Sequence, residues 1–135
     1  MAIQVQNVLY VEDDPPSRTV MEVLMTYELR VPSFMVFEDS ENFLERVKAL
    51  PMRPDVVLLD IHVKPHDGFT MLTILRENGF SDTVIIALTA SVMNDEVKRL
   101  ETAGFNGIIA KPVNVDVFPR LWGRIIRNEP VWSIM

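Results

Sequence analysis

The sequence predicts a doubly wound α/β domain, in which helices cover both faces of a parallel sheet. Three observations indicate this fold class. Short apolar runs recur along the chain, segments with helical periodicity follow them, and the runs are continuously apolar rather than alternating. Strands of a parallel sheet are buried on both faces, so they have this continuous apolar character. A succession of strand–helix units is typical of such domains.

Five apolar segments are the predicted strands, and each ends beside polar or turn-forming residues. They cover residues 7–11, 34–37, 56–59, 84–88 and 107–110. The segments that follow them carry apolar residues at three- and four-residue spacing, which predicts helices. These five helices are expected over about 17–29, 40–50, 69–78, 94–103 and 115–127.

The apolar side chains of the predicted helices are expected to pack on the sheet. The expected inner faces carry Val20, Val23, Leu24 and Tyr27; Phe43, Leu44, Val47 and Leu50; Val97 and Leu100; and Phe118, Leu121, Trp122 and Ile125. Ser40 is expected to cap the second helix, and Gly79 and Gly104 to end the third and fourth. The aromatic residues in this set are interpreted as core residues, not as a cofactor site.

The composition indicates one globular domain. The chain has 135 residues, 48% of them apolar and 24% charged, which is enough apolar material for one core. We expect a single domain over residues 1–135, with its core at about 7–127 and a tail at 128–135. The segment Pro130–Met135 is unusually apolar for a terminus. It either packs on the domain, which we favour, or pairs with another subunit or partner.

Several classes of protein are disfavoured by composition and charge. The absence of cysteine excludes disulfides, zinc–thiolate sites and cysteine nucleophiles. A net charge of −6 without a basic cluster disfavours direct nucleic-acid binding. No apolar stretch reaches the roughly 18 residues of a membrane span, and the first residues do not have the pattern of a secretion signal. We therefore expect a cytoplasmic protein without direct membrane or nucleic-acid contacts.

Charged and hydroxyl side chains stand at the carboxyl ends of four predicted strands. They are Glu12, Asp13 and Asp14 after the first strand, Asp60 after the third, Thr89 after the fourth and Lys111 after the fifth. Ligands of doubly wound folds bind outside the carboxyl ends of the strands. We therefore expect these groups to meet in one pocket, although they are far apart in the sequence.

Such a pocket is suited to phosphoryl chemistry. Crowded carboxylates raise one another's pKa unless a cation lies among them, and Mg²⁺ prefers carboxylate, water and phosphate oxygens. Asp60 is then placed as a nucleophile that forms an aspartyl phosphate. Lys111 and Thr89 are expected to contact the phosphoryl oxygens, over which negative charge spreads in the transition state.

Each of these residues has a simpler interpretation when it is taken alone. The acidic triplet at 12–14 could be a solvated loop that caps a helix, Asp60 could cap a turn, and Lys111 could merely end a strand. Their shared position at strand ends favours the pocket. His62 and His66 lie in one short loop and are interpreted as solvated residues, not as a metal pair or a pH sensor.

Five short motifs occur in order along the chain. They are Val8-Leu-Tyr-Val-Glu-Asp-Asp-Pro15, Asp55-Val-Val-Leu-Leu-Asp60, Asp67-Gly68, Leu88-Thr-Ala90 and Ala110-Lys-Pro112. Through these motifs, and from about residue 7 to 127, the chain resembles the receiver domain of two-component response regulators. The resemblance implies a flavodoxin-like sheet of five strands in the order 2-1-3-4-5, with five flanking helices.

The resemblance also implies roles and partners. It matches Asp60 to the phosphoacceptor, Glu12 and Asp13 to the acidic pair that binds Mg²⁺, Thr89 and Lys111 to the conserved hydroxyl and lysine, and the backbone carbonyl of His62 to a further metal ligand. Receivers catalyse their own phosphorylation by a histidine kinase or phosphotransfer protein and are not turnover enzymes. An unknown downstream partner is expected, and a homodimer through the fourth helix, fifth strand and fifth helix is a further hypothesis.

Two positions depart from the family pattern. Lys64 stands where the family usually has proline, with Pro65 one residue later, and it either contacts the phosphoryl group or points to solvent. Ile108 stands where the family commonly has the tyrosine or phenylalanine that rotates on activation. Ile108 keeps open an alternative, a receiver-like interaction module that works without phosphorylation. A phosphatase with an aspartyl intermediate is disfavoured, because His62 stands where its second acid would be.

Overall fold

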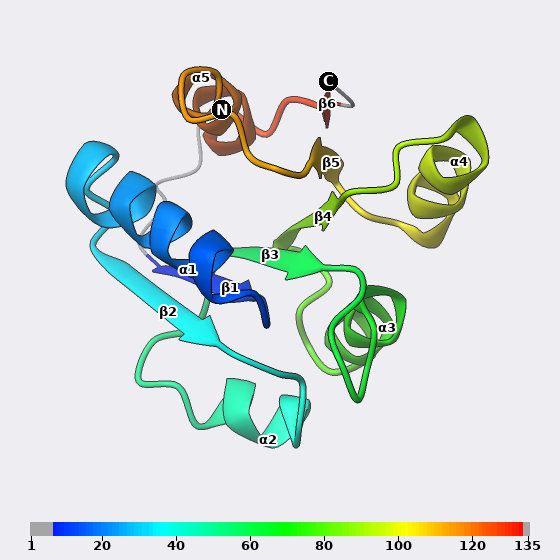
Figure 1. Ribbon diagram of the computed structural model, residues 1–135. Helices are drawn as coiled ribbons and strands as arrows, with labels where there is room; N and C mark the ends of the chain where they lie inside the picture. Colours follow the sequence, from blue (N-terminus) through cyan, green and yellow to red (C-terminus); the bar gives the residue numbers. More distant parts are fainter. Residues whose placement is uncertain (1–6, 134–135) are drawn as a thin grey trace.

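A six-stranded parallel sheet runs through the computed structural model, which describes residues 7–133 (Figure 1). The strands are β1 (Asn7–Val11), β2 (Ser33–Phe37), β3 (Val56–Asp60), β4 (Val84–Thr89), β5 (Gly107–Ala110) and β6 (Val131–Ser133). They lie in the order β2-β1-β3-β4-β5-β6, and all neighbours are parallel. The predicted order of the first five strands is therefore confirmed, and a sixth strand extends the sheet.

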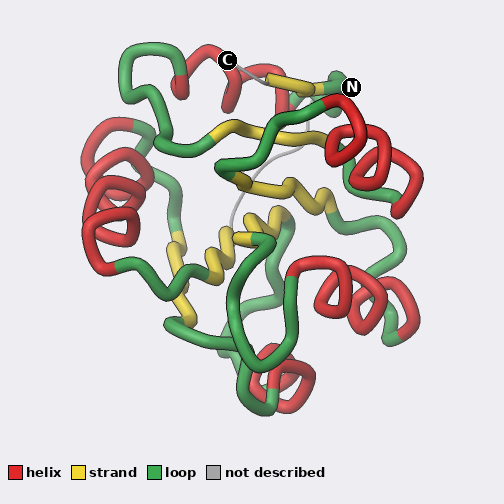
Figure 2. The backbone as a smooth tube through the Cα atoms, turned by 45° about the vertical axis from the view of Figure 1, so that its right-hand side comes forward, coloured by secondary structure: helices red, strands yellow, loops and turns green. Residues whose placement is uncertain are grey.

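Helices cover both faces of this sheet, as Figure 2 shows from a second direction. They are α1 (Pro15–Glu22), the π-helical turn η1 (Val23–Glu28) that continues it, α2 (Phe43–Lys48), α3 (Gly68–Glu77), α4 (Asn94–Ala103) and α5 (Phe118–Ile126). Helices α1 and α5 lie on one face, and α2, α3 and α4 lie on the other (Figure 1). Within the described residues, no helix is long and apolar enough to cross a membrane.

The two faces of the sheet have separate cores, because successive side chains of a strand point to opposite sides. In β3, Val57 and Leu59 face the core under α2, α3 and α4, whereas Val56 and Leu58 face the core under α1 and α5. All four side chains are fully buried. Burial on both sides explains why the strands are continuously apolar in the sequence.

The predicted inner face of the first helix is wrong in three of its four residues. Val20, Val23 and Tyr27 are 39%, 46% and 72% exposed, and the buried residues are Met21, Leu24 and Met25. Both sets have helical spacing, so periodicity alone does not choose between them. The chain also changes from α- to π-helical geometry at residue 23, which rotates the later side chains away from the positions expected for an α-helix.

The predicted cap of the second helix is also wrong. Helix α2 begins at Phe43, and Asn42 precedes it in a left-handed conformation without a side-chain cap. Ser40 is instead buried, where its hydroxyl donates to the His66 carbonyl and accepts from the His66 amide, both at 2.7 Å. Ser40 therefore joins the loop after β2 to the loop after β3, a long-range contact that sequence spacing does not show.

Apart from these differences, the side chains predicted to lie on the inner faces of the helices agree with the structure. Phe43 and Val47 of α2, Leu100 of α4, and Phe118, Leu121, Trp122 and Ile125 of α5 are buried as expected. Leu44 is half-buried, and Leu50 and Val97 pack against the core. Helix α5 begins at residue 118 instead of 115, because the Asn114 side chain accepts hydrogen bonds from the amides of residues 116 and 117 and forms a turn there.

The C-terminal tail packs on the domain as β6, next to β5. Val131 is buried in the core under α1 and α5, and Arg124 of α5 donates to the Pro130 carbonyl at 2.6 Å. Gly107 permits this approach, since a Cβ atom at that position would lie 2.3 Å from the Val131 carbonyl oxygen. Residues 134–135 of the predicted tail lie outside the described residues, as do residues 1–6.

Candidate functional site

The carboxyl end of β1 positions the first two acidic residues. The amide of Glu12 donates to the Phe37 carbonyl of β2 at 3.0 Å, and Arg18 of α1 donates to the Glu12 carbonyl at 3.0 Å. These contacts hold the backbone where β1 ends. Glu12 is fully buried and Asp13 is exposed, so the two neighbouring carboxylates differ strongly in their access to water.

Asp60 is the last residue of β3 and is itself buried. The next amide, that of Ile61, donates to the Leu88 carbonyl of β4 at 3.2 Å, and the His62 amide donates to Asp60 Oδ1 at 3.3 Å. Helix α3 begins close by at Gly68, where a Cβ atom would lie 2.5 Å from Ile61 Cδ1. The glycine therefore permits the close approach of α3 to the end of β3.

Lys111 connects the carboxylates of β1 and β3. Its Nζ lies 2.6 Å from Glu12 Oε1 and 3.6 Å from Asp60 Oδ2. The backbone after β5 is fixed by a hydrogen bond from the Lys111 amide to the Thr89 carbonyl at 2.9 Å. Thr89 is buried at the end of β4, and its hydroxyl accepts from the Ser91 amide at 3.0 Å.

The electrostatics of the site follow from burial and crowding. Burial raises the pKa of Glu12, and the neighbouring Asp60 raises it further, while the hydrogen bonds from Lys111 and Tyr10 oppose this shift. Burial alone would lower the pKa of Lys111, but its hydrogen bond to Glu12 and the charge of Asp60 raise it overall. The lysine therefore stays charged and compensates a cluster of negative groups.

The donor set fits a hard divalent cation. Glu12, Asp13 and Asp60 each bring a carboxylate oxygen within 4.8 Å of the other two. Mg²⁺ prefers oxygen ligands, typically one or two carboxylates together with water and phosphate oxygens. The further ligand expected from the sequence, the carbonyl of His62, stays a prediction. The side chain of His62 is exposed, as expected for a solvated loop residue.

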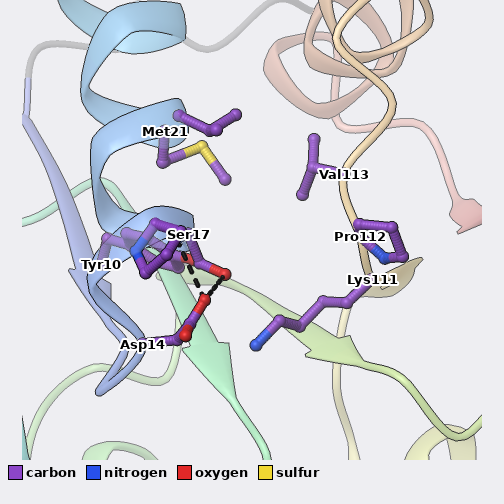
Figure 3. Close-up of a pocket in the computed structure, with 9 residues that line it drawn as sticks. Tyr10, Asp14, Ser17, Met21, Lys111, Pro112 and Val113 are labelled. Atoms are coloured by element: carbon purple, nitrogen blue, oxygen red, sulfur yellow. Dashed lines mark hydrogen bonds between the residues drawn. The ribbon is translucent and has the colours of Figure 1, made fainter.

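A pocket of about 240 Å³ opens beside this cluster, between α1 and the segment that follows β5 (Figure 3). Its lining is mostly apolar and includes Met21 and Val113, and Tyr10 and Lys111 also line it. Asp14 lies at its edge and caps α1, accepting hydrogen bonds from the amide and hydroxyl of Ser17. Of the acidic triplet at 12–14, Asp14 is therefore the residue that caps the helix.

Sequence reasoning missed two residues that build the site. Arg18 holds the backbone of Glu12, and Tyr10 donates its hydroxyl hydrogen to Glu12 Oε1 at 2.9 Å. The signal for Tyr10 was present, since it is a polar group in an apolar strand, two residues before Glu12 and thus on the same side of the strand. No pattern in the sequence indicates the contact of Arg18.

Comparison with known proteins gives consistent results. The family model for the response regulator receiver domain matches residues 8–120. A probable C4-dicarboxylate response regulator, DctR of Priestia megaterium, is 34% identical over 107 residues, which are 78% of this chain and 45% of that protein. A second DctR, from Halalkalibacterium halodurans, is 30% identical and is covered to 54%. The chain thus spans about half the length of these relatives.

Solved structures show the same fold. The response regulator DrrB of Thermotoga maritima superposes with a TM-score of 0.77 at 22% identity, over 94% of this chain and 55% of that one. The receiver domain of a sensor histidine kinase from Pseudomonas aeruginosa PAO1 superposes with a TM-score of 0.74 at 27% identity, over 90% of this chain and 98% of that one. That receiver has a magnesium ion coordinated in its active-site cleft.

Proposed function

This chain belongs to the response regulator receiver domain family, and from that premise we propose that Asp60 accepts a phosphoryl group while Glu12 and Asp13 hold Mg²⁺ beside it. The observation that carries the proposal is the convergence of three carboxylates within 4.8 Å, with the ammonium group of Lys111 next to two of them. Glu12 and Asp60 are buried, and a buried ion pair with Lys111 is weak evidence for a purely structural role.

The transfer step is a displacement at phosphorus. An oxygen of Asp60 forms the new P–O bond, and the donor's bond to phosphorus breaks with its electron pair leaving on the donor. When bound, Mg²⁺ supplies positive charge to the phosphoryl oxygens. Lys111 adds a second positive charge from the end of β5. The Thr89 hydroxyl donates to a phosphoryl oxygen after it turns from the Ser91 carbonyl, to which it now lies at 3.4 Å.

The proposed donor is a histidine kinase or a phosphotransfer protein. Such a partner needs a docking surface that brings its phosphohistidine to Asp60. Val20 and Val23 are exposed apolar residues of the first helical segment, and Val20 lines the wall of the pocket. Exposed apolar groups of this kind are typical of interaction sites. The domain's output, through a downstream partner or a homodimer, is part of the same proposal.

Intact-mass analysis after incubation with acetyl phosphate and Mg²⁺ tests this function. We expect the wild-type chain to gain one phosphoryl group and Asp60→Asn to gain none. Asp82→Asn is the matched control, because Asp82 is an exposed aspartate before β4, at the opposite end of the sheet. If the wild type binds Mg²⁺ without gaining a phosphoryl group, the chain is instead an interaction module that works without phosphorylation.

A further inference from the structure

Tyr10 is a buried tyrosine whose hydroxyl has no part in the function described so far. Its ring is fully buried and stacks on Phe34 of β2, with the ring centroids 6.4 Å apart. Its hydroxyl lies 2.9 Å from Glu12 Oε1 and donates to it. Figure 3 shows Tyr10 and Lys111 on opposite sides of the pocket. The hydroxyl is thus directed toward the charged end of an otherwise apolar core.

The oxygen that accepts from Tyr10 also accepts from Lys111. Lys111 Nζ lies 2.6 Å from the same Oε1 atom. Glu12 is fully buried, so water does not readily replace a donor that leaves. Loss of both donors would leave a buried carboxylate oxygen without a hydrogen bond, which is costly for a charged group.

One of these two donors, Lys111, also lies beside the proposed phosphoacceptor, Asp60. Lys111 Nζ is 1.0 Å closer to Glu12 Oε1, at 2.6 Å, than to Asp60 Oδ2, at 3.6 Å. A phosphoryl group on Asp60 would give the lysine a second anionic partner, toward which its ammonium group can turn from Glu12. Tyr10 is held by its strand and by Phe34, so its hydroxyl stays where it is.

We propose that Tyr10 is a positioning residue that keeps Glu12 hydrogen-bonded when Lys111 turns to the phosphoryl group. Tyr10 does not touch the phosphoryl group and acts through Glu12 alone. This inference rests on the proposed function, since it presumes that Asp60 is phosphorylated. A tyrosine hydroxyl is protonated at neutral pH, so it can donate to Glu12.

Replacement of Tyr10 by phenylalanine isolates the hydroxyl, because the ring and its packing remain. In Tyr10→Phe, we expect the maximal rate of phosphorylation by acetyl phosphate at saturating Mg²⁺ to fall about tenfold, the effect of one hydrogen bond to a charged group. The KM for acetyl phosphate should stay unchanged, since the lost contact matters only when Lys111 moves. Tyr27→Phe is the matched control, because Tyr27 is exposed.

A double-mutant cycle in the metal-free protein gives a second readout that needs no phosphorylation. Lys111→Met removes the other donor while keeping an unbranched side chain. Each variant is described by the factor by which it raises the unfolding equilibrium constant of the wild type at pH 8. We expect the factor of the double variant to exceed the product of the two single-variant factors by about tenfold, because only the double variant leaves Oε1 without a donor. Independent effects would overturn the proposed sharing of Glu12.

The two measurements separate the inference from the function on which it rests. If the wild type and Tyr27→Phe gain a phosphoryl group and Tyr10→Phe gains it at the same rate, the inference is wrong and the function stands. If the wild type gains none, the proposed function fails, and Tyr10 has no role in phosphorylation. A raised KM with an unchanged maximal rate would also overturn the inference, because Tyr10 would then act on donor binding.

Discussion

Glu12 is surrounded by polar groups and has no access to solvent. It accepts hydrogen bonds from Tyr10 and Lys111 and lies beside Asp60. Burial first, and then Asp60, raises its pKa. A raised pKa means that the folded chain binds the proton of Glu12 more tightly than the unfolded chain does. The ionised form that a cation requires is therefore the form that costs stability in the metal-free protein.

This cost predicts a pH dependence that Glu12→Gln isolates, because glutamine has no proton to lose. We expect the free energy of unfolding of the metal-free wild type, minus that of Glu12→Gln, to fall as the pH rises from the ordinary glutamate value of 4.5 through the raised pKa of Glu12. The wild type is relatively most stable below that window, where Glu12 is protonated in both states. Urea denaturation at a series of pH values measures the difference.

The control for this measurement is Glu41→Gln, because Glu41 is an exposed glutamate in the loop before α2. Its difference from the wild type should stay nearly flat over the same pH range. A difference for Glu12 that rises with pH would show that Lys111 and Tyr10 outweigh burial. In that case, the ionised form would stabilise the fold.

At the scale of elements, β6 forms the edge of the sheet next to β5, whereas β5 itself is the edge strand of the predicted five-stranded sheet. The strand pairs Val131 with Gly107 and Trp132 with Ile108. Ile108, the departure from the family's usual aromatic, is fully buried in the core under α4. The face proposed for output therefore consists of α4, β5, β6 and α5. Any partner that approaches the edge of β5 meets β6 first.

Gly107→Ala should displace β6 and leave the rest of the sheet in place. The added Cβ would lie 2.3 Å from the Val131 carbonyl oxygen, so the strand must shift. We expect a loss of about 1–3 kcal/mol in the free energy of unfolding, typical of overpacking. Amide hydrogen exchange should become faster at residues 131–133, as measured by mass spectrometry.

Gly123→Ala is the matched control for this prediction. Gly123 lies in α5, and its added Cβ would meet only the Arg127 side chain, at 3.4 Å. Alanine in a helix is favoured over glycine by about 1 kcal/mol, so this variant should be slightly more stable. Unchanged exchange at β6 in Gly107→Ala would show that the strand does not depend on the close approach at Gly107.

The elements show what the sequence could and could not predict. The strands and most helices were predictable from residue type. Strands such as β3 are buried on both faces and are therefore continuously apolar, whereas helices such as α5 are buried on one face and carry apolar residues at helical spacing. The face of α1 was not, because Met21 and Val20 both continue a helical pattern. Ser40 acts through His66, a partner 26 positions away in another loop, and local patterns contain no information about such a contact. The residue that permits β6 to pair with β5 is Gly107. Its role depends on Val131, which lies 24 positions later in the sequence.

At the scale of the whole molecule, the site joins the carboxyl ends of β1, β3, β4 and β5. Glu12, Asp60, Thr89 and Lys111 belong to different strand ends and are connected through hydrogen bonds and ion pairs. A ligand bound at this edge therefore contacts segments from most of the sheet. A ligand that binds the folded chain and not the unfolded chain raises the free energy of unfolding by mass action.

Magnesium should therefore stabilise the chain, and Asp13 allows a test that does not disturb the core. At a Mg²⁺ concentration one hundred times the Kd, the free energy of unfolding of the wild type should rise by about 2.7 kcal/mol. Asp13→Asn should lose most of this gain. Asp13 is exposed, and its replacement removes one charge from a repulsive cluster, so the metal-free variant should be at least as stable as the wild type. Urea denaturation with and without Mg²⁺ measures both effects, with Asp82→Asn as the control that keeps the full gain. Equal stabilisation of Asp13→Asn and the wild type would place the ion away from Asp13, and the proposed role of Asp13 as a Mg²⁺ ligand would then be wrong.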